Sequence, residues 1–328
     1  MSTYLFSPSG QAPGDVWSIS RKIAIRTDVT NAKHGLNTYF EAGPGETIWD
    51  KLRRAFPGWG SAPGGKGPFY RTALEPAQYY PRMARPLNQA PHAAHYSEWS
   101  PSVLGEEDFM AIARGQLTTL TRLLDRICET IHPTDRTVGS LPKTFNAYGH
   151  DIRNLLILAC TEVETHWRGV LVANGKVKKK NKKGDDMDFK TSDYVALQRA
   201  MRLGEYAVSF HKYPWLEARK PFKAWRSSKA TQSLKWYAAY NAVKHDREFE
   251  FAQATLHHVF DAISACVIMM VAQFGRLWGL GYGSEALSSF HFSSVPAWSL
   301  SETYIGNYGA TNVLGAPPDP WSPVPFKF

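Results

Sequence analysis

The chain has 328 residues, of which 43% are hydrophobic and 20% are charged, which is the composition of an ordinary soluble protein with a large core. The formal net charge is +9, but six lysines between positions 176 and 183 supply most of it. The rest of the chain is nearly balanced in charge, so the basic character is a local feature.

The N-terminus, the most apolar run and the cysteines indicate the cellular compartment in which the protein is expected. The first residues show no charged segment followed by an apolar core, so no secretory signal is expected. The most apolar run, residues 262–272, is too short to span a bilayer, and Asp261 abuts it. Cys128, Cys160 and Cys266 each lie in an apolar helical pattern, which indicates buried free thiols without a disulfide framework. We therefore expect a cytoplasmic protein without membrane contact.

Residues 1–103 are rich in proline, glycine and aromatic residues. Residues 16–26 predict a strand, because hydrophobic and polar residues alternate, although the alternation slips at Arg21. Residues 46–56 predict a short helix that ends before a Pro-Gly pair. Proline and glycine interrupt the remaining chain too often for long elements. We expect a small, largely irregular subdomain that packs on the core.

Residues 104–278 have the helical spacing of apolar residues that the first part lacks. Five helices are predicted, over residues 104–131, 152–171, 191–210, from about 231 to 245, and 249–277. Residues 279–328 return to glycine, proline, serine and aromatic residues and predict a second irregular arm. The fold class is therefore mainly α, a helical bundle flanked by two aromatic-rich arms.

A lysine-rich loop separates the second and third predicted helices. Such a loop is most often solvated surface, but it also attracts polyanions without sequence preference. If it binds nucleic acid, the contacts come from Lys176, Lys178, Lys179, Lys180, Lys182 and Lys183.

A polar motif precedes the last long helix. On a helix, Asn241 and His245 are four residues apart and share a face, with Tyr237 one turn earlier. His245 carries the side chain whose ordinary pKa allows proton exchange near neutral pH. Lys244 and Arg247 supply fixed positive charge beside it. The motif predicts either a site acting on a phosphodiester or simply a helix end with a solvated basic tail.

This motif resembles that of the HEPN superfamily, whose helical members include many metal-independent ribonucleases of toxin–antitoxin and antiphage systems. The family signature is Arg and His separated by four to six residues, often with Asn after the Arg. Here the match is Asn241-Ala-Val-Lys244-His245, followed by Arg247. Asn stands where Arg is expected, and only three residues intervene.

The resemblance covers about residues 104–278 and implies an endoribonuclease that needs no metal or cofactor. It also implies a homodimer with two motifs facing each other and, for a toxin, a neutralising partner protein. Polar residues on an earlier helix lie near the site in some members, and Glu162, Glu164 and His166 resemble them. The expected product is an RNA end with a 2′,3′-cyclic phosphate.

Two alternatives remain open. The first is a non-catalytic helical module that binds nucleic acid or a protein partner through the lysine-rich loop and the aromatic arms. The second is a metal enzyme, because Glu162 and His166 are four residues apart, as are His257 and Asp261.

Two further motifs are set aside. The glycine-rich residues 60–67 nearly fit a phosphate-binding loop but lack its hydroxyl residue. His92 and His95 form a pair without a third metal ligand.

Overall fold

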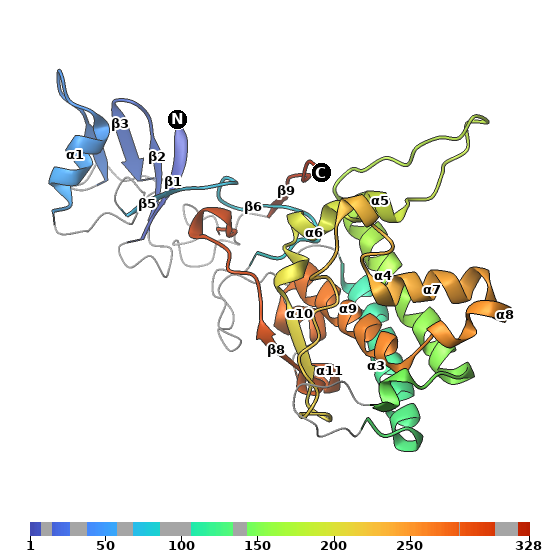
Figure 1. Cartoon of the computed structure of the whole chain (residues 1–328). Coiled ribbons are helices and arrows are strands. Elements are labelled where there is room, and N and C mark those ends of the chain that lie inside the picture. Colours follow the sequence, from blue (N-terminus) through green and yellow to red (C-terminus); the bar gives the residue numbers. More distant parts are fainter. Residues whose placement is uncertain are drawn as a thin grey trace. The chain divides into compact units, whose positions relative to one another are not determined.

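A computed structural model describes residues 1–7, 15–26, 38–57, 68–85, 106–133, 143–281, 283–305 and 321–328 (Figure 1). The chain divides into two compact units. The sheet unit comprises Met1–Tyr79, Arg85–Ser97 and Ala297–Val324. The helical unit comprises Tyr80–Ala84, Glu98–Pro296 and Pro325–Phe328.

The sheet unit is built on a five-stranded antiparallel sheet in the order β4-β3-β2-β1-β5. Its strands are β1 (Ser2–Phe6), β2 (Val16–Ile19), β3 (Ile23–Arg26), β4 (Tyr39–Glu41) and β5 (Phe69–Arg71). Helix α1 (Ile48–Ala55) buries Ile48 and Leu52 against Phe6, Trp17 and Phe69. Outside this sheet, β6 (Gln78–Tyr79) and β9 (Ser322–Pro323) pair in parallel, and the short helix η5 spans Leu300–Glu302.

The prediction of a largely irregular N-terminal part is wrong for the described residues. The predicted strand over 16–26 is two strands, β2 and β3, and the slip at Arg21 marks the turn between them, which Ser20 N–H closes by donating to Ile23 O at 2.8 Å. Each of the other three strands has only three to five residues, too few for alternation to identify it. The predicted helix over 46–56 is confirmed as α1, with Thr47 as its N-cap.

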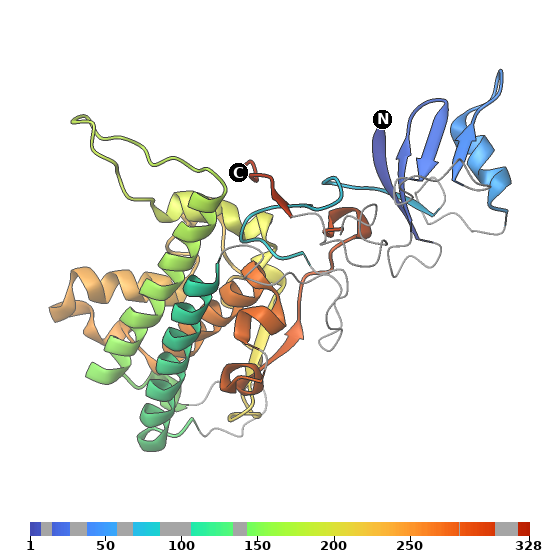
Figure 2. The same cartoon turned by 180° about the vertical axis from the view of Figure 1, so that it is seen from behind.

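The helical unit packs four long helices together (Figure 2). They are α3 (Glu107–Thr130), α4 (His150–Ala173), α7 (Lys235–His245) and α9 (Leu256–Phe274). Shorter elements complete the unit: η1 (Lys143–Asn146), α5 (Thr191–Tyr194), α6 (Ala196–Ala200), η2 (Leu203–Glu205), β7 (Ala207–Phe210), η3 (Ser227–Lys229), α8 (Arg247–Glu250), η4 (Phe251–Gln253), α10 (Arg276–Leu280), α11 (Glu285–Ser289) and β8 (Phe290–Ser294). A helix-rich fold is thus confirmed, with strands that the five-helix prediction lacked.

Helix α9 is the centre of the helical unit. All its residues except His257 and His258 are buried, and α9 contacts α3, α4, α7 and α10. Among the described residues it is the one helix long and apolar enough to cross a membrane, but its side chains are covered by the rest of the unit. That burial is typical of the core helix of a soluble protein.

Two predicted helices are wrong in their bounds. The helix over 191–210 stops at Ala200, Arg202 adopts a left-handed conformation with φ +52°, and β7 follows. The reason is tertiary, since β7 pairs antiparallel with β8, eighty residues later in the chain. The final helix is preceded by the separate short helices α8 and η4, and α9 itself begins after Thr255.

The boundaries of the predicted C-terminal arm also differ from the units. The described residues of 279–296 belong to the helical unit, where β8 pairs with β7. Those of 297–324 belong to the sheet unit.

The three cysteines are free and buried, as predicted. Burial raises the pKa of the Cys128 thiol to about 11 and holds the pKa of Cys160 and of Cys266 well above the ordinary value. All three are therefore neutral thiols at physiological pH.

Phe260 tests the packing of α9 against β7. Its ring is fully buried, with ring centroids 4.9 Å from Phe210 and 5.1 Å from Phe145. We expect Phe260→Ala to lower the free energy of unfolding by about 3–5 kcal/mol, because it leaves a cavity. Urea unfolding followed by helical circular dichroism measures this. Ile112→Ala, at a side chain that is 72% exposed, should change stability by less than about 0.5 kcal/mol; equal effects would contradict the packing.

Candidate functional site

The last turn of α7 carries Lys244 and His245 at the surface of the helical unit. The His245 side chain is exposed, and within the described ranges no hydrogen bond or ion pair holds it. The next residue, Asp246, ends α7, and its carboxylate accepts a hydrogen bond from Phe249 N–H at 3.1 Å. His245 is therefore presented to solvent at the end of a well-packed helix.

Lys244 is held by a chain of polar contacts between α7 and α4. Its Nζ donates to the Tyr240 hydroxyl at 2.8 Å and lies 5.0 Å from the centre of that ring. Tyr237 and Tyr240 donate in turn to the Glu164 carboxylate, at 2.6 and 3.5 Å. The bond to Tyr240 raises the pKa of Lys244, while burial and then Glu164 raise the pKa of Tyr237. Lys244 thus remains a fixed cation beside His245.

The other two residues of the motif are placed differently. Asn241 donates from Nδ2 to Tyr237 O at 2.8 Å, so its amide bonds to the backbone of its own helix. Arg247 begins α8, and its side chain lies outside what the structure describes. Of the four predicted catalytic residues, the structure brings Lys244 and His245 into one exposed turn.

Arg153 of α4 is a cation near this turn that the sequence did not single out. Its Nη2 donates to Val243 O, one of the free carbonyls at the end of α7, at 3.0 Å. The guanidinium therefore lies at the same helix end as Lys244 and His245. Arg153 precedes Val243 by ninety residues, so no local spacing could have pointed to it.

Glu162 and His166 lie on a different face of α4, towards the core. His166 is 1% exposed, its Nδ1 accepts from Gln273 Nε2 at 2.9 Å, and its Nε2 is 3.4 Å from Glu162 Oε1. Burial, together with the charge of Arg82, lowers the pKa of His166 to about 3. His166 is consequently a neutral core residue, apart from the turn that holds His245.

The four residues of the metal hypothesis do not meet. His257 precedes Gln273, the partner of His166, by sixteen residues of α9, or about 24 Å of helix. Arg219 lies at the second pair instead, since it donates to Asp261 Oδ1 at 2.8 Å from Nε and to His257 Nε2 at 2.5 Å from Nη2. No group of three or more possible metal ligands occurs among the described residues. His92, His95 and residues 60–67 lie outside them.

The lysine-rich loop is an ordered hairpin, here called the lysine hairpin (residues 176–190). Lys180 and Asp186 face each other in a bridge, Met187 N–H donates to Lys179 O at 2.7 Å, and the Asn181 side chain accepts from two backbone N–H groups of the turn. Figures 1 and 2 show it extending away from the helices. Lys178 pairs with Asp188 at 3.1 Å. The other lysines of the hairpin have no ion-pair partner in the described part of the chain.

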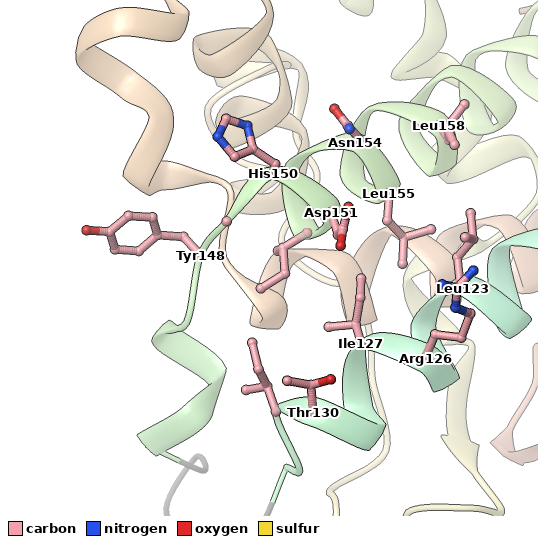
Figure 3. Close-up of a pocket in the computed structure, with 13 residues that line it drawn as sticks. Leu123, Arg126, Ile127, Thr130, Tyr148, His150, Asp151, Asn154, Leu155 and Leu158 are labelled. Carbon is pink, nitrogen blue, oxygen red and sulfur yellow. The ribbon is translucent and has the colours of Figure 1, made fainter.

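A cavity of about 640 Å³ lies between α3 and α4. Figure 3 shows Arg126 and Thr130 of α3 and Asp151 and Asn154 of α4 along it. None of the predicted site residues lines it. The size of this cavity is therefore no argument for a site at the turn that holds His245.

Comparisons with protein-family models, with curated proteins and with solved structures found no match to this chain.

The burial of His166 predicts a pH dependence of stability. The pKa is about 3 in the folded protein and ordinary in the unfolded chain, so the unfolded state binds more protons between these values and stability falls as pH drops through that window. From pH 7 to pH 5, His166 should cost about 2 kcal/mol. Urea unfolding at both pH values should show that His166→Gln removes this part of the decrease.

His150→Gln, at an exposed histidine, is the matched control substitution and is unfolded at the same two pH values. If His166→Gln and the original protein lost the same free energy between pH 7 and pH 5, the neutral buried state of His166 would be refuted.

Proposed function

We propose that the protein is a HEPN-like, metal-independent endoribonuclease in which His245 transfers the proton. The observation that carries the proposal is the exposure of His245 in the last turn of α7, beside Lys244 and near the guanidinium of Arg153. An imidazole in this position can reach a substrate, and the two cations lie at the same helix end.

The reaction uses a nucleophile that RNA supplies. The 2′-oxygen attacks the adjacent phosphorus, the bond to the 5′-oxygen breaks, and the products are a 2′,3′-cyclic phosphate and a 5′-hydroxyl. His245 either removes the proton from the 2′-hydroxyl or donates one to the leaving oxygen. Lys244 and Arg153 stabilise the negative charge that develops on the phosphorane oxygens. No metal ion or cofactor takes part.

The chemistry needs both a base and an acid. A homodimer in which two α7 helix ends face each other would supply one His245 for each role, as the resemblance to the HEPN superfamily implies. The same resemblance suggests a role in toxin–antitoxin or antiphage systems, with a neutralising partner protein in the first case.

Incubation of the full chain with RNA in EDTA tests this proposal. We expect cleavage that yields 2′,3′-cyclic phosphate ends and that falls at least about a hundredfold in His245→Ala, because general acid–base catalysis contributes on this scale. His132→Ala, at another exposed histidine, is the control and should cleave at the original rate. No cleavage by the unmodified protein, or equal cleavage by all three proteins, would rule out His245 as the catalytic residue.

A second candidate function is nucleic-acid binding without catalysis. It is favoured by the lysine hairpin, whose hydrogen-bonded backbone extends into solvent and carries lysines that have no ion-pair partner among the described residues. Phosphate groups bound there would displace counterions, so affinity should fall steeply with salt.

Replacing lysines of the hairpin by neutral residues distinguishes nucleic-acid binding by the hairpin from cleavage by His245. The fourfold variant Lys179→Gln, Lys180→Gln, Lys182→Gln, Lys183→Gln should weaken RNA binding and reduce the slope of log K against log salt by up to about 3. The matched control changes four exposed lysines elsewhere to glutamine, Lys220, Lys223, Lys229 and Lys235. Fluorescence anisotropy at several salt concentrations measures both. Equal slopes for the two variants would show that the hairpin is not the contact surface.

A further inference from the structure

A small hollow of about 90 Å³ lies at the base of the lysine hairpin. Its polar lining consists of Lys176, Lys179, Asp188, Lys190, Ser192 and Asp193. On this measure a cavity of about 10–15 Å³ admits one water molecule, so the hollow has room for a group of a few heavy atoms. Lys190 and Ser192 follow the lysine run in the sequence and were not predicted as site residues.

The acidic residues of the hollow already have partners. Asp188 is 3.1 Å from Lys178 Nζ and 3.9 Å from Arg168 Nη2. The hydrogen bond from Lys178, its charge and that of Arg168 lower the pKa of Asp188. Asp193 accepts a hydrogen bond from Lys190 N–H at 2.9 Å. Both carboxylates are thus neutralised or bonded within the protein.

The three lysines of the hollow, unlike its two carboxylates, have no such partners among the described residues. Lys176, Lys179 and Lys190 are exposed, and no carboxylate among the described residues forms an ion pair with any of them. Their positive charges around a small hollow are therefore left for an anion.

The backbone around the hollow is fixed by hydrogen bonds. Gly175, which follows the C-cap of α4, has φ +76°, and Lys176 N–H donates to Leu171 O at 2.9 Å. On the other side, Met187 N–H bonds to Lys179 O at 2.7 Å. These bonds fix the backbone of Lys176 and Lys179 before any ligand arrives, so binding has to order only their side chains.

We propose that this hollow is a binding site for a phosphate group, held by Lys176, Lys179 and Lys190 with the Ser192 hydroxyl as a further donor. Several ammonium groups act as point charges around a tetrahedral anion, whereas a planar carboxylate is better matched by the fork of an arginine. The site deepens the proposed action on RNA, because it would fix one phosphate of a bound strand at the base of the hairpin.

The phosphate can be a free ion, the 5′-phosphate of an RNA strand or a phosphate of its backbone. Titration of the isotopically labelled full chain with inorganic phosphate should shift the Ser192 backbone amide resonance saturably. The double variant Lys176→Gln, Lys190→Gln should weaken this binding at least about tenfold. The matched double variant Lys220→Gln, Lys223→Gln, at exposed lysines outside the hairpin, should keep it.

Short RNA strands with and without a 5′-phosphate identify the source. If the hollow holds the strand end, the unmodified protein prefers the 5′-phosphorylated strand, and only the Lys176, Lys190 variant loses the preference. If it holds a backbone phosphate, the strands bind equally and the Lys176, Lys190 variant binds both more weakly than the Lys220, Lys223 variant. If phosphate binds and neither strand does, the ligand is the free ion.

The proposal is overturned if phosphate causes no saturable shift at Ser192 or if the two double variants bind phosphate equally. Either result leaves the nuclease proposal standing, provided that RNA is still cleaved in a manner that depends on His245. Conversely, phosphate binding by a chain that neither binds nor cleaves RNA would reject the proposed function and retain the site.

Discussion

The burial of α9 is the constraint on which the helical unit depends. A helix that is apolar on every side must be surrounded, and α3, α4, α7 and α10 surround it. Any polar side chain on such a helix needs a partner in the core. Asp261 bonds to Arg219, and Gln273 bonds to His166. His166, which could have been a metal ligand, is therefore part of the core.

The two faces of α4 explain why the motif on α7 is at the surface. One face directs His166 and Cys160 into the core. The other meets α7, where Glu164 accepts from two tyrosines and Arg153 bonds to the end of the helix. These contacts fix the position of α7 and hold Lys244, and they leave His245 exposed. One face of α4 thus holds the buried His166, and the other face supports the helix that carries the exposed His245.

The sequence predicted the parts of the fold that local periodicity determines. The helices α3, α4 and α7 follow from apolar residues repeating along one segment, so each could be recognised without its neighbours. The strand β7 could not, because Ala207 to Phe210 continue a helical pattern and become a strand only by pairing with Phe290 to Ser294. The sheet of the N-terminal part was missed for the same reason, since its strands are short and pair with distant segments.

For the candidate site, the residue types could be predicted from the sequence, but the contacts could not. The motif placed Lys244 and His245 at a helix end, and the structure agrees. It could not show that the amide of Asn241 bonds to its own backbone or that Arg153 reaches the same turn. Lys190 and Ser192 lie beyond the lysine run, and only the folding of the hairpin brings them beside Lys176.

The burial of the three cysteines has a practical consequence. Thiol-directed reagents react with the nucleophilic thiolate, and Cys128, Cys160 and Cys266 are neutral and covered. A cysteine introduced at an exposed position of the lysine hairpin or of α7 would therefore be the one that reacts in the folded protein. Fluorescent dyes, spin labels or photo-crosslinkers can thus be attached at one chosen position without first removing the native thiols.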